Sequence, residues 1–123
     1  MQTFLPYPDY AQSVACLDNR RLGKQRVEAW QIFLAITNRD YGWQSHPAVN
    51  MWRKNVGSLI DYGIACCEEW IARGYDDGML ERFMQAKRDY PNGNKPNWIG
   101  NDRFHASHRS NLLRKDSKYY YGM

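Results

Sequence analysis

Apolar residues recur at three- and four-residue intervals through the middle of the chain, which is the spacing of a helix with one buried face. Pro47 suits the first turn of this helix, because the N–H that proline lacks would have no intrahelical acceptor there. Gly74 suits its end, because glycine tolerates the left-handed conformation that often follows a last helical turn. The pattern therefore predicts one long central helix from Pro47 to about Arg73. Its repeating positions are Val49, Trp52, Val56, Leu59, Ile60, Gly63, Ile64, Cys67, Trp70 and Ile71.

Shorter helical patterns flank the central one and are separated by stretches rich in turn-forming residues. Pro6 and Pro8 predict an extended arm at the start of the chain, because proline fixes φ and disfavours a helical residue before it. Asp77 and Asp102 each precede a helical pattern and are expected to cap it. The expected elements are an arm over 1–10, a helix from about 11 to 19 or into the segment 17–28, a helix from that segment to about 37, helices over about 77–84 and 102–115, and loops over 38–46 and 90–101.

No stretch alternates apolar and polar residues for long, as a half-buried strand does, and no internal repeat is visible. A chain of 123 residues is typical of one domain, and five Trp, nine Tyr and four Phe supply material for a core. We therefore predict an all-α fold. It is a single compact domain, 1–123, of about four to five helices packed around the long central helix, with an extended N-terminal arm.

The charge balance permits a polyanionic partner without requiring one, since seventeen Lys and Arg against thirteen Asp and Glu leave a net charge of +4. The three cysteines lack the spacing of a metal site and are expected to be free thiols in a reducing compartment. No apolar run reaches membrane-spanning length, and the N-terminus lacks the pattern of a signal peptide. We therefore expect a cytoplasmic protein with no membrane partner and no cofactor.

The segment from Arg20 to Glu28 carries the most informative chemistry, because four cations surround one carboxylate there. On a helix, Arg21, Gln25 and Glu28 form one polar line beside an apolar line that would face the core. A carboxylate in such a place can stabilise a developing positive charge or activate water, as cleavage of a glycosidic bond requires. A solvated helix face with a Lys24–Glu28 surface pair is the alternative interpretation. The cations are Arg20, Arg21, Lys24 and Arg26.

A second cluster lies near the C-terminus, where His105, His108 and Arg109 share one face of the last predicted helix. Two imidazoles and a guanidinium can surround a phosphate, although a solvated basic helix has the same pattern. Histidines three residues apart can also bind a metal, but no dependable third ligand accompanies them, so no metal is expected. His46, directly before Pro47, is a further candidate for the site.

Four motifs span nearly the whole chain in order. They are Arg21-Leu22 with Gln25 and Glu28, then Gly42-Trp-Gln-Ser-His46, then Glu68-Glu-Trp-Ile-Ala-Arg-Gly-Tyr75, and finally Lys118-Tyr-Tyr-Tyr-Gly122. In this order they resemble the pyrimidine-dimer DNA glycosylases of the endonuclease V type. The resemblance implies a compact all-helical fold and cleavage of a base–sugar N-glycosidic bond in DNA repair.

The resemblance also implies roles for single residues. Glu28 matches a glutamate that stabilises the cationic sugar and organises proton transfer, and the N-terminal amine, here that of Met1, attacks the anomeric carbon. Basic residues of the same helix hold phosphates, and C-terminal aromatic residues touch the base. Together with the clusters above, the predicted substrate and phosphate contacts are Arg20, Arg21, Lys24, Gln25, His46, His105, His108 and Arg109, with Trp43, Tyr120 and Tyr121 as base-stacking residues.

Two positions depart from the family pattern. The attacking amine of the family belongs to a small residue exposed by removal of the initiator methionine, but the bulk of Gln2 should block that removal here. We therefore expect hydrolysis more readily than strand-cutting lyase chemistry. Val27 occupies the place of an arginine before the key glutamate, and Arg26 stands one residue earlier. A shift of one residue turns a helical side chain by about 100°.

Three functions are compatible with these features. The first is an N-glycosidase acting on damaged pyrimidines in DNA. The second has the same chemistry but takes a small nucleotide, such as a linear or cyclic dinucleotide signal, because a duplex binder usually carries a larger basic field. The third is a non-catalytic module that binds nucleic acid or nucleotides through the same cations.

Overall fold

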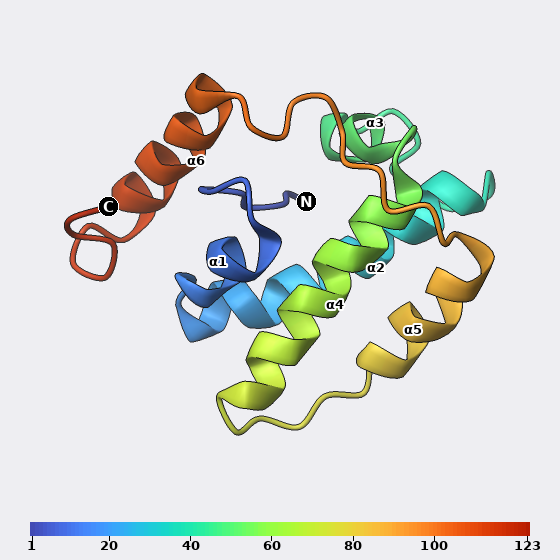
Figure 1. The fold of residues 1–123 in the computed structure, drawn as a ribbon, viewed down its shortest axis with the longest axis horizontal. Helices are drawn as coiled ribbons and strands as arrows, with labels where there is room; N and C mark the ends of the chain where they lie inside the picture. Colours follow the sequence, from blue (N-terminus) through green and yellow to red (C-terminus); the bar gives the residue numbers. More distant parts are fainter.

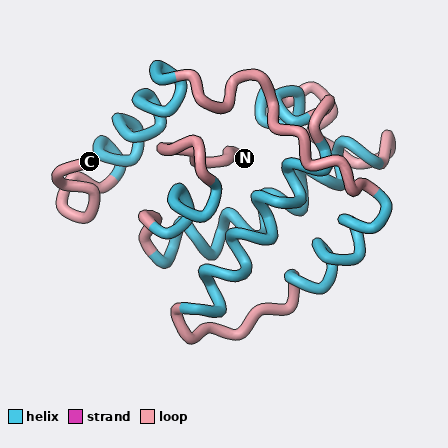
Figure 2. The backbone as a smooth tube through the Cα atoms, in the orientation of Figure 1, coloured by secondary structure: helices cyan, strands magenta, loops and turns pink.

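Six helices and no strand make up the computed structural model, which describes all 123 residues (Figure 1 and Figure 2). The predicted all-α class is therefore confirmed. None of the helices has both the length and the apolar character needed to cross a membrane. The helices are α1 (Tyr10–Ala15), α2 (Asn19–Thr37), α3 (Pro47–Trp52), α4 (Val56–Ala72), α5 (Leu80–Asp89) and α6 (Asp102–Lys115).

α4 is the central helix, and α1, α2, α3 and α5 all contact it (Figure 1). Its inner face contributes fully buried side chains, among them Leu59, Ile60 and Tyr62. The approach of α5 depends on Gly63, because a Cβ there would lie 2.3 Å from the ring of Phe83. The apolar periodicity of the sequence thus marks the face around which the other helices pack.

The predicted central helix is two helices in the structure, which corrects the sequence-based expectation. α3 ends at Trp52 and α4 begins at Val56, and Asn55 between them has φ −135° and ψ 47°, outside the helical region. The Asn55 N–H donates to the carbonyl of Trp52 at 2.8 Å, and its side-chain amide donates to the carbonyl of Asn94 at 3.0 Å. A contact with a distant loop therefore stabilises the break.

The end of α2 at Thr37, the bounds of α6 and the stop of α4 before Gly74, which has φ 94°, are confirmed. α1 ends at Ala15, earlier than the expected residue 19, and α5 covers Leu80–Asp89 instead of 77–84. Asp77 was expected to cap α5; its carboxylate accepts the N–H of Leu80, the first residue of the helix, at 2.7 Å, while the N-cap position itself is Met79. At α6 the cap is Asn101 instead of Asp102, and its side chain accepts an N–H of the first turn at 3.0 Å. Asp102 is the first residue of that helix.

The N-terminal arm runs between α6 and the other helices (Figure 1). Thr3, Phe4 and Leu5 are buried. Two side chains of α6 hold the backbone of Leu5: His108 Nδ1 accepts its N–H at 2.9 Å, and His105 Nδ1 lies 2.7 Å from its carbonyl. The arm is therefore a part of the core, and α6 packs over it.

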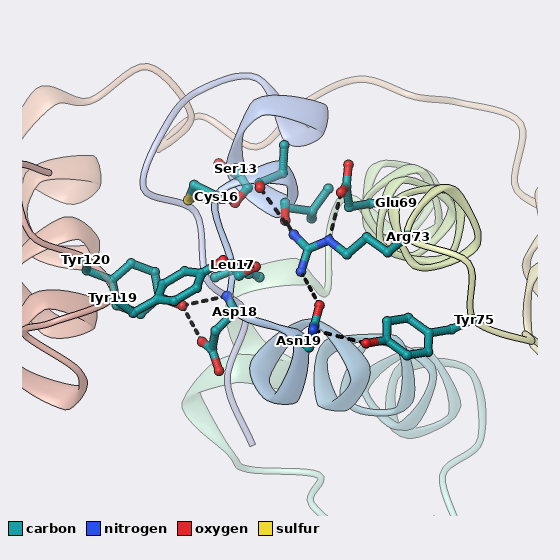
Figure 3. Close-up of polar contacts among 12 residues, drawn as sticks. Ser13, Cys16, Leu17, Asp18, Asn19, Glu69, Arg73, Tyr75, Tyr119 and Tyr120 are labelled. Atoms are coloured by element: carbon teal, nitrogen blue, oxygen red, sulfur yellow. Dashed lines mark hydrogen bonds and ion pairs between the residues drawn. The ribbon is translucent and has the colours of Figure 1, made fainter.

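Arg73, just after α4, fixes the start of α2 relative to α1 (Figure 3). Its guanidinium donates to the carbonyls of Val14 and Ala15 at 3.4 and 3.2 Å, and to the side chain of Asn19 at 2.9 Å. The carbonyl of Ala15, in the last turn of α1, has no other donor, so this cation satisfies it. The segment that carries the predicted site thus begins at a fixed place.

Candidate active site

A cleft of about 510 Å³ opens between the arm, the first turns of α2 and the end of α6. Its walls come from three segments that are far apart in the sequence, and they carry charges of both signs. The lining residues are Met1, Gln2, Phe4, Asp18, Arg20, Arg21, Lys24, Gln25, Glu28, Lys115 and Asp116. The structure therefore brings together Met1, Glu28 and the cations Arg20, Arg21 and Lys24 of the predicted site.

Glu28 is partly buried at this cleft and does not extend into bulk solvent. Its Oε2 accepts the backbone N–H of Gln2 and the side-chain amide of Gln25, both at 3.1 Å. Its Oε1 has no hydrogen-bond partner. One oxygen thus anchors the side chain, while the other stays available to a bound molecule. No Lys24–Glu28 pair forms, so this carboxylate is engaged by the arm and not by a surface cation.

Met1 lines the same cleft, and the residues after it are held firmly. The backbone of Gln2 is bonded to α2 through both its N–H and its carbonyl. The hydroxyl of Thr3 accepts from the indole N–H of Trp52, at 3.1 Å. Leu5, two residues further on, is held by the two histidines of α6. Met1 is therefore held at the cleft by the short, fixed segment that follows it.

The four cations of the motif have different surroundings. Arg20 and Lys24 are exposed and form no ion pair or hydrogen bond. Arg21 is 3.2 Å from the carboxylate of Asp18. Arg26 points away from the cleft, where it pairs with the fully buried side chain of Asp77 and lies over an indole ring. Two cations are thus free for an anionic ligand, while Arg26 joins α2 to the segment before α5.

Gln25 was predicted to contact the substrate, but its side chain is buried and its amide is fully occupied by the protein. Its Oε1 accepts from the N–H of Phe4 at 2.9 Å and from the hydroxyl of Tyr62 at 2.6 Å. Its Nε2 donates to the carbonyl of Gln2 at 2.8 Å and to Glu28. No hydrogen-bonding position is left for a phosphate.

His105 and His108 are also committed to the protein. Since His105 Nε2 accepts the N–H of Gly100 at 2.9 Å, its proton is on Nδ1 and is donated to the carbonyl of Leu5. Burial, with a smaller effect of His105, lowers the pKa of His108 to about 4. Arg109 donates to a carbonyl of the arm at 2.8 Å. These three residues anchor the arm, and the geometry does not form the predicted phosphate cradle.

The remaining predicted contacts lie at or beyond the edge of the cleft. His46 caps α3, accepting the N–H of Ala48 at 3.1 Å, and lines a second pocket of about 200 Å³ that also includes Met1. Trp43 packs edge-on against His46 and is 55% exposed. Tyr121 is 89% exposed, which leaves its ring free. None of these three side chains lines the main cleft.

Tyr120 is buried, which is incompatible with stacking on a base. Its hydroxyl donates to the carboxylate of Asp18 and accepts the N–H of that residue at 2.9 Å (Figure 3). Burial raises the pKa of the Asp18 carboxyl, but hydrogen bonds from Tyr120 and Arg21 outweigh it and lower the pKa. Because Asp18 caps α2, this contact ties the C-terminal tail to the helix that carries Glu28.

Sequence comparison identifies the family. A family model described as pyrimidine dimer DNA glycosylase matches residues 1–82. The chain belongs to this family. The matched residues include the arm, α1 to α4 and the first residues of α5, and therefore both Met1 and Glu28. No curated protein and no solved structure matches the chain.

Sequence reasoning missed several residues that line the cleft. Lys115 and Asp116 reach it from the end of α6, and no local pattern connects them with α2. Asp18 was detectable, since an aspartate directly before a helical pattern is a typical cap. Its contact with Tyr120 joins residues 102 positions apart and has no signature in the sequence.

Proposed function

We propose that this member of the pyrimidine dimer DNA glycosylase family hydrolyses the base–sugar N-glycosidic bond of damaged pyrimidines in DNA. One observation carries the proposal. Glu28, with one unbonded oxygen, lines a single cleft with the chain's own terminal residue and with two unpaired cations, Arg20 and Lys24. Such a set matches a reaction in which a sugar becomes cationic next to a phosphate backbone.

The chemistry follows from the charges. As the bond from the sugar C1′ to the base breaks, its electron pair leaves with the base and positive charge develops on the sugar. The free oxygen of Glu28 stabilises that charge, and an anion fixed in advance does so without reorganisation. Arg20 and Lys24 bind flanking phosphates, because exposed cations are the usual phosphate contacts. Extrusion of the nucleotide from the duplex exposes the bond to these groups.

The Met1 amine is the proposed nucleophile. Its nitrogen bonds to C1′ as the base leaves, and one amine proton goes to the base. Transfer of the second amine proton to the ring oxygen opens the sugar and gives an imine. Water then releases the sugar and restores the amine. Elimination of the neighbouring phosphate from the imine would cut the strand. We expect this branch to be minor, because the amine belongs to Met1, a larger residue than the small one that carries the amine in the family pattern.

Replacement of Glu28 tests the proposal. Glu28→Gln keeps the shape of the side chain but removes the anion, and we expect base release from irradiated duplex DNA to fall about 100- to 1000-fold. Binding of the same DNA should change little, because the cations remain. Borohydride added during turnover should attach the sugar to the N-terminal residue of the parent. A Glu28→Gln variant that releases base at the parental rate would rule out this function.

A small nucleotide is a second candidate, favoured by the small number of free cations at the cleft, which are Arg20, Lys24 and Lys115. Only Arg20 and Lys24 of the four motif cations are unpaired, whereas a duplex binder usually neutralises many phosphates. The two candidates differ in salt dependence. Duplex binding should weaken steeply as salt rises, and binding of a cyclic dinucleotide with two phosphates should weaken much less. Free base released from a dinucleotide, and none from irradiated duplex, would favour the second candidate.

A further inference from the structure

The side chain of Gln25 connects the start of the chain with Glu28. It is 1% exposed, and all four of its hydrogen-bonding positions are filled. Its amide orientation is fixed by the partners. An exchange of the oxygen and nitrogen would point the NH₂ group at the N–H of Phe4, and two donors cannot bond to one another. The observed orientation of the amide is therefore the one that satisfies both its oxygen and its nitrogen.

Gln25 bonds the N-terminal arm and Glu28, the two parts of the chain that carry the groups of the proposed reaction. The carbonyl of Gln2 and the N–H of Phe4 are two residues apart on an extended segment, so one amide bonds that segment as a neighbouring strand would. The same Nε2 donates its second proton to Glu28 at 3.1 Å. The arm and the carboxylate are thus attached to a single rigid group.

Tyr62 of α4 holds this amide from the core side. Its hydroxyl lies 2.6 Å from Gln25 Oε1 and 2.8 Å from the carbonyl of Phe4. Complete burial raises the pKa of Tyr62 well above its ordinary value, so the hydroxyl keeps its proton. A donor on the central helix therefore supports the acceptor side of Gln25, while its bonds to Phe4, Gln2 and Glu28 hold the amide in place.

We propose that Gln25 is a positioning residue that holds the N-terminal amine and the Glu28 carboxylate in their reactive arrangement. This inference rests on the function proposed above. Gln25 touches neither the substrate nor the reacting atoms. It acts through the carbonyl of Gln2 and through Oε2 of Glu28, which leaves Oε1 of Glu28 and the amine of Met1 for the sugar.

Gln25→Glu tests the role, because it keeps the shape and the acceptor for Phe4 but loses the NH₂ donor to Gln2 and Glu28. The titratable groups against this position are Glu28 and Tyr62, so an ionised residue 25 would repel the first. We expect the single-turnover rate of base release to fall about 100-fold at neutral pH, as for a displacement of about 1 Å in an active site. The loss should shrink at mildly acid pH, where a protonated Glu can donate one hydrogen bond. Substrate affinity should stay within about threefold of the parent, since the phosphate contacts remain.

Tyr62→Phe is the matched control. It removes a buried hydroxyl from the same network but leaves both donors of Gln25 in place, so the rate of the folded protein should stay within about tenfold of the parent. Equal losses in both variants, without the pH effect, would indicate general loosening and overturn the inference. A Gln25→Glu variant with the parental rate and pH profile would overturn it too, while an inactive Glu28→Gln variant would still support the proposed function.

NMR relaxation of the Gln2 amide gives a readout that needs no catalysis. The amide should gain fast motion in Gln25→Glu and remain rigid in Tyr62→Phe. If the parent released no base, the proposed function would fail, and this measurement alone would decide the role of Gln25. A Gln2 amide as rigid in Gln25→Glu as in the parent would then reject it.

Discussion

At the scale of single residues, buried polar side chains hold the start of the chain. His108 is the clearest case, since it lies in the interior and its Nδ1 must be unprotonated to accept the N–H of Leu5. Protonation would turn Nδ1 of His108 into a donor, and it would then face another donor, the N–H of Leu5. The arm therefore depends on a neutral imidazole, and this requirement links the geometry of the site to pH.

The stability of the protein should fall in a defined acid range because of His108. Its pKa is about 4 in the folded protein and about 6.5 for an unperturbed histidine, so between these values the unfolded chain binds more protons. The contribution of the neutral ring to the free energy of unfolding is therefore complete above pH 6.5, and about 3 kcal/mol of it is lost as the pH falls from 6.5 to 4. His108→Asn, whose side-chain oxygen can accept the same N–H, should be less stable at neutral pH but lose less between these values. Thermal unfolding against pH measures both, and an unchanged slope in the variant would contradict the assignment.

The sequence predicts residue roles well where the partners are close along the chain. The line of Arg21, Gln25 and Glu28 follows from helical spacing, and the structure places all three at one cleft. The role of Gln25 could not be predicted, because all the groups it bonds except Glu28 lie 21 to 37 residues away. A polar side chain on a helix has the same pattern whether it bonds a phosphate or a buried backbone.

At the scale of elements, the break between α3 and α4 shows what periodicity leaves out. The apolar spacing continues across residues 53–55, so the sequence predicts one helix. The break is stabilised by the loop that follows α5, through the bond from Asn55 to Asn94. That loop has no periodic pattern, and its place against α4 follows from the packing of α5. An interruption that depends on a distant segment has no local signal.

The same junction predicts the effect of a substitution at Gly57. A Cβ at this position would lie 2.0 Å from the carbonyl oxygen of Asn92, which is backbone and cannot rotate away. Gly57→Ala should therefore displace the loop after α5 and lower the free energy of unfolding by about 2 kcal/mol. Gly42→Ala is the control, because nothing lies within 4 Å of its Cβ and it should have little effect. Urea unfolding of both variants measures the difference, and equal stabilities would show that the loop adjusts freely.

At the scale of the whole molecule, the position of the site depends on four helices. The arm is hydrogen-bonded to side chains of α2, α4 and α6, and the indole of Trp52 in α3 donates to Thr3. α6 in turn packs over the arm (Figure 1), and Tyr120 in the tail after it bonds Asp18 at the start of α2 (Figure 3). Contacts along the whole length of the chain are therefore needed to present Met1 beside Glu28, so loss of the fold and loss of the site should coincide.

Extension of the N-terminus by one residue should separate binding from chemistry. A glycine added before Met1 moves the amine by about 3.5 Å along the chain, while Gln2 to Leu5 keep their hydrogen bonds. The extended protein should melt at the parental temperature and bind DNA with the parental affinity. Its single-turnover rate of base release should fall at least about 100-fold, because a nucleophile misplaced by 1 Å already has an effect of this size. Borohydride should trap no sugar on it. A glycine added after Met123 is the matched control and should change none of these values. If the N-terminally extended protein still released base and was still trapped, the amine of Met1 could not be the nucleophile, because its nitrogen would then be part of a peptide bond.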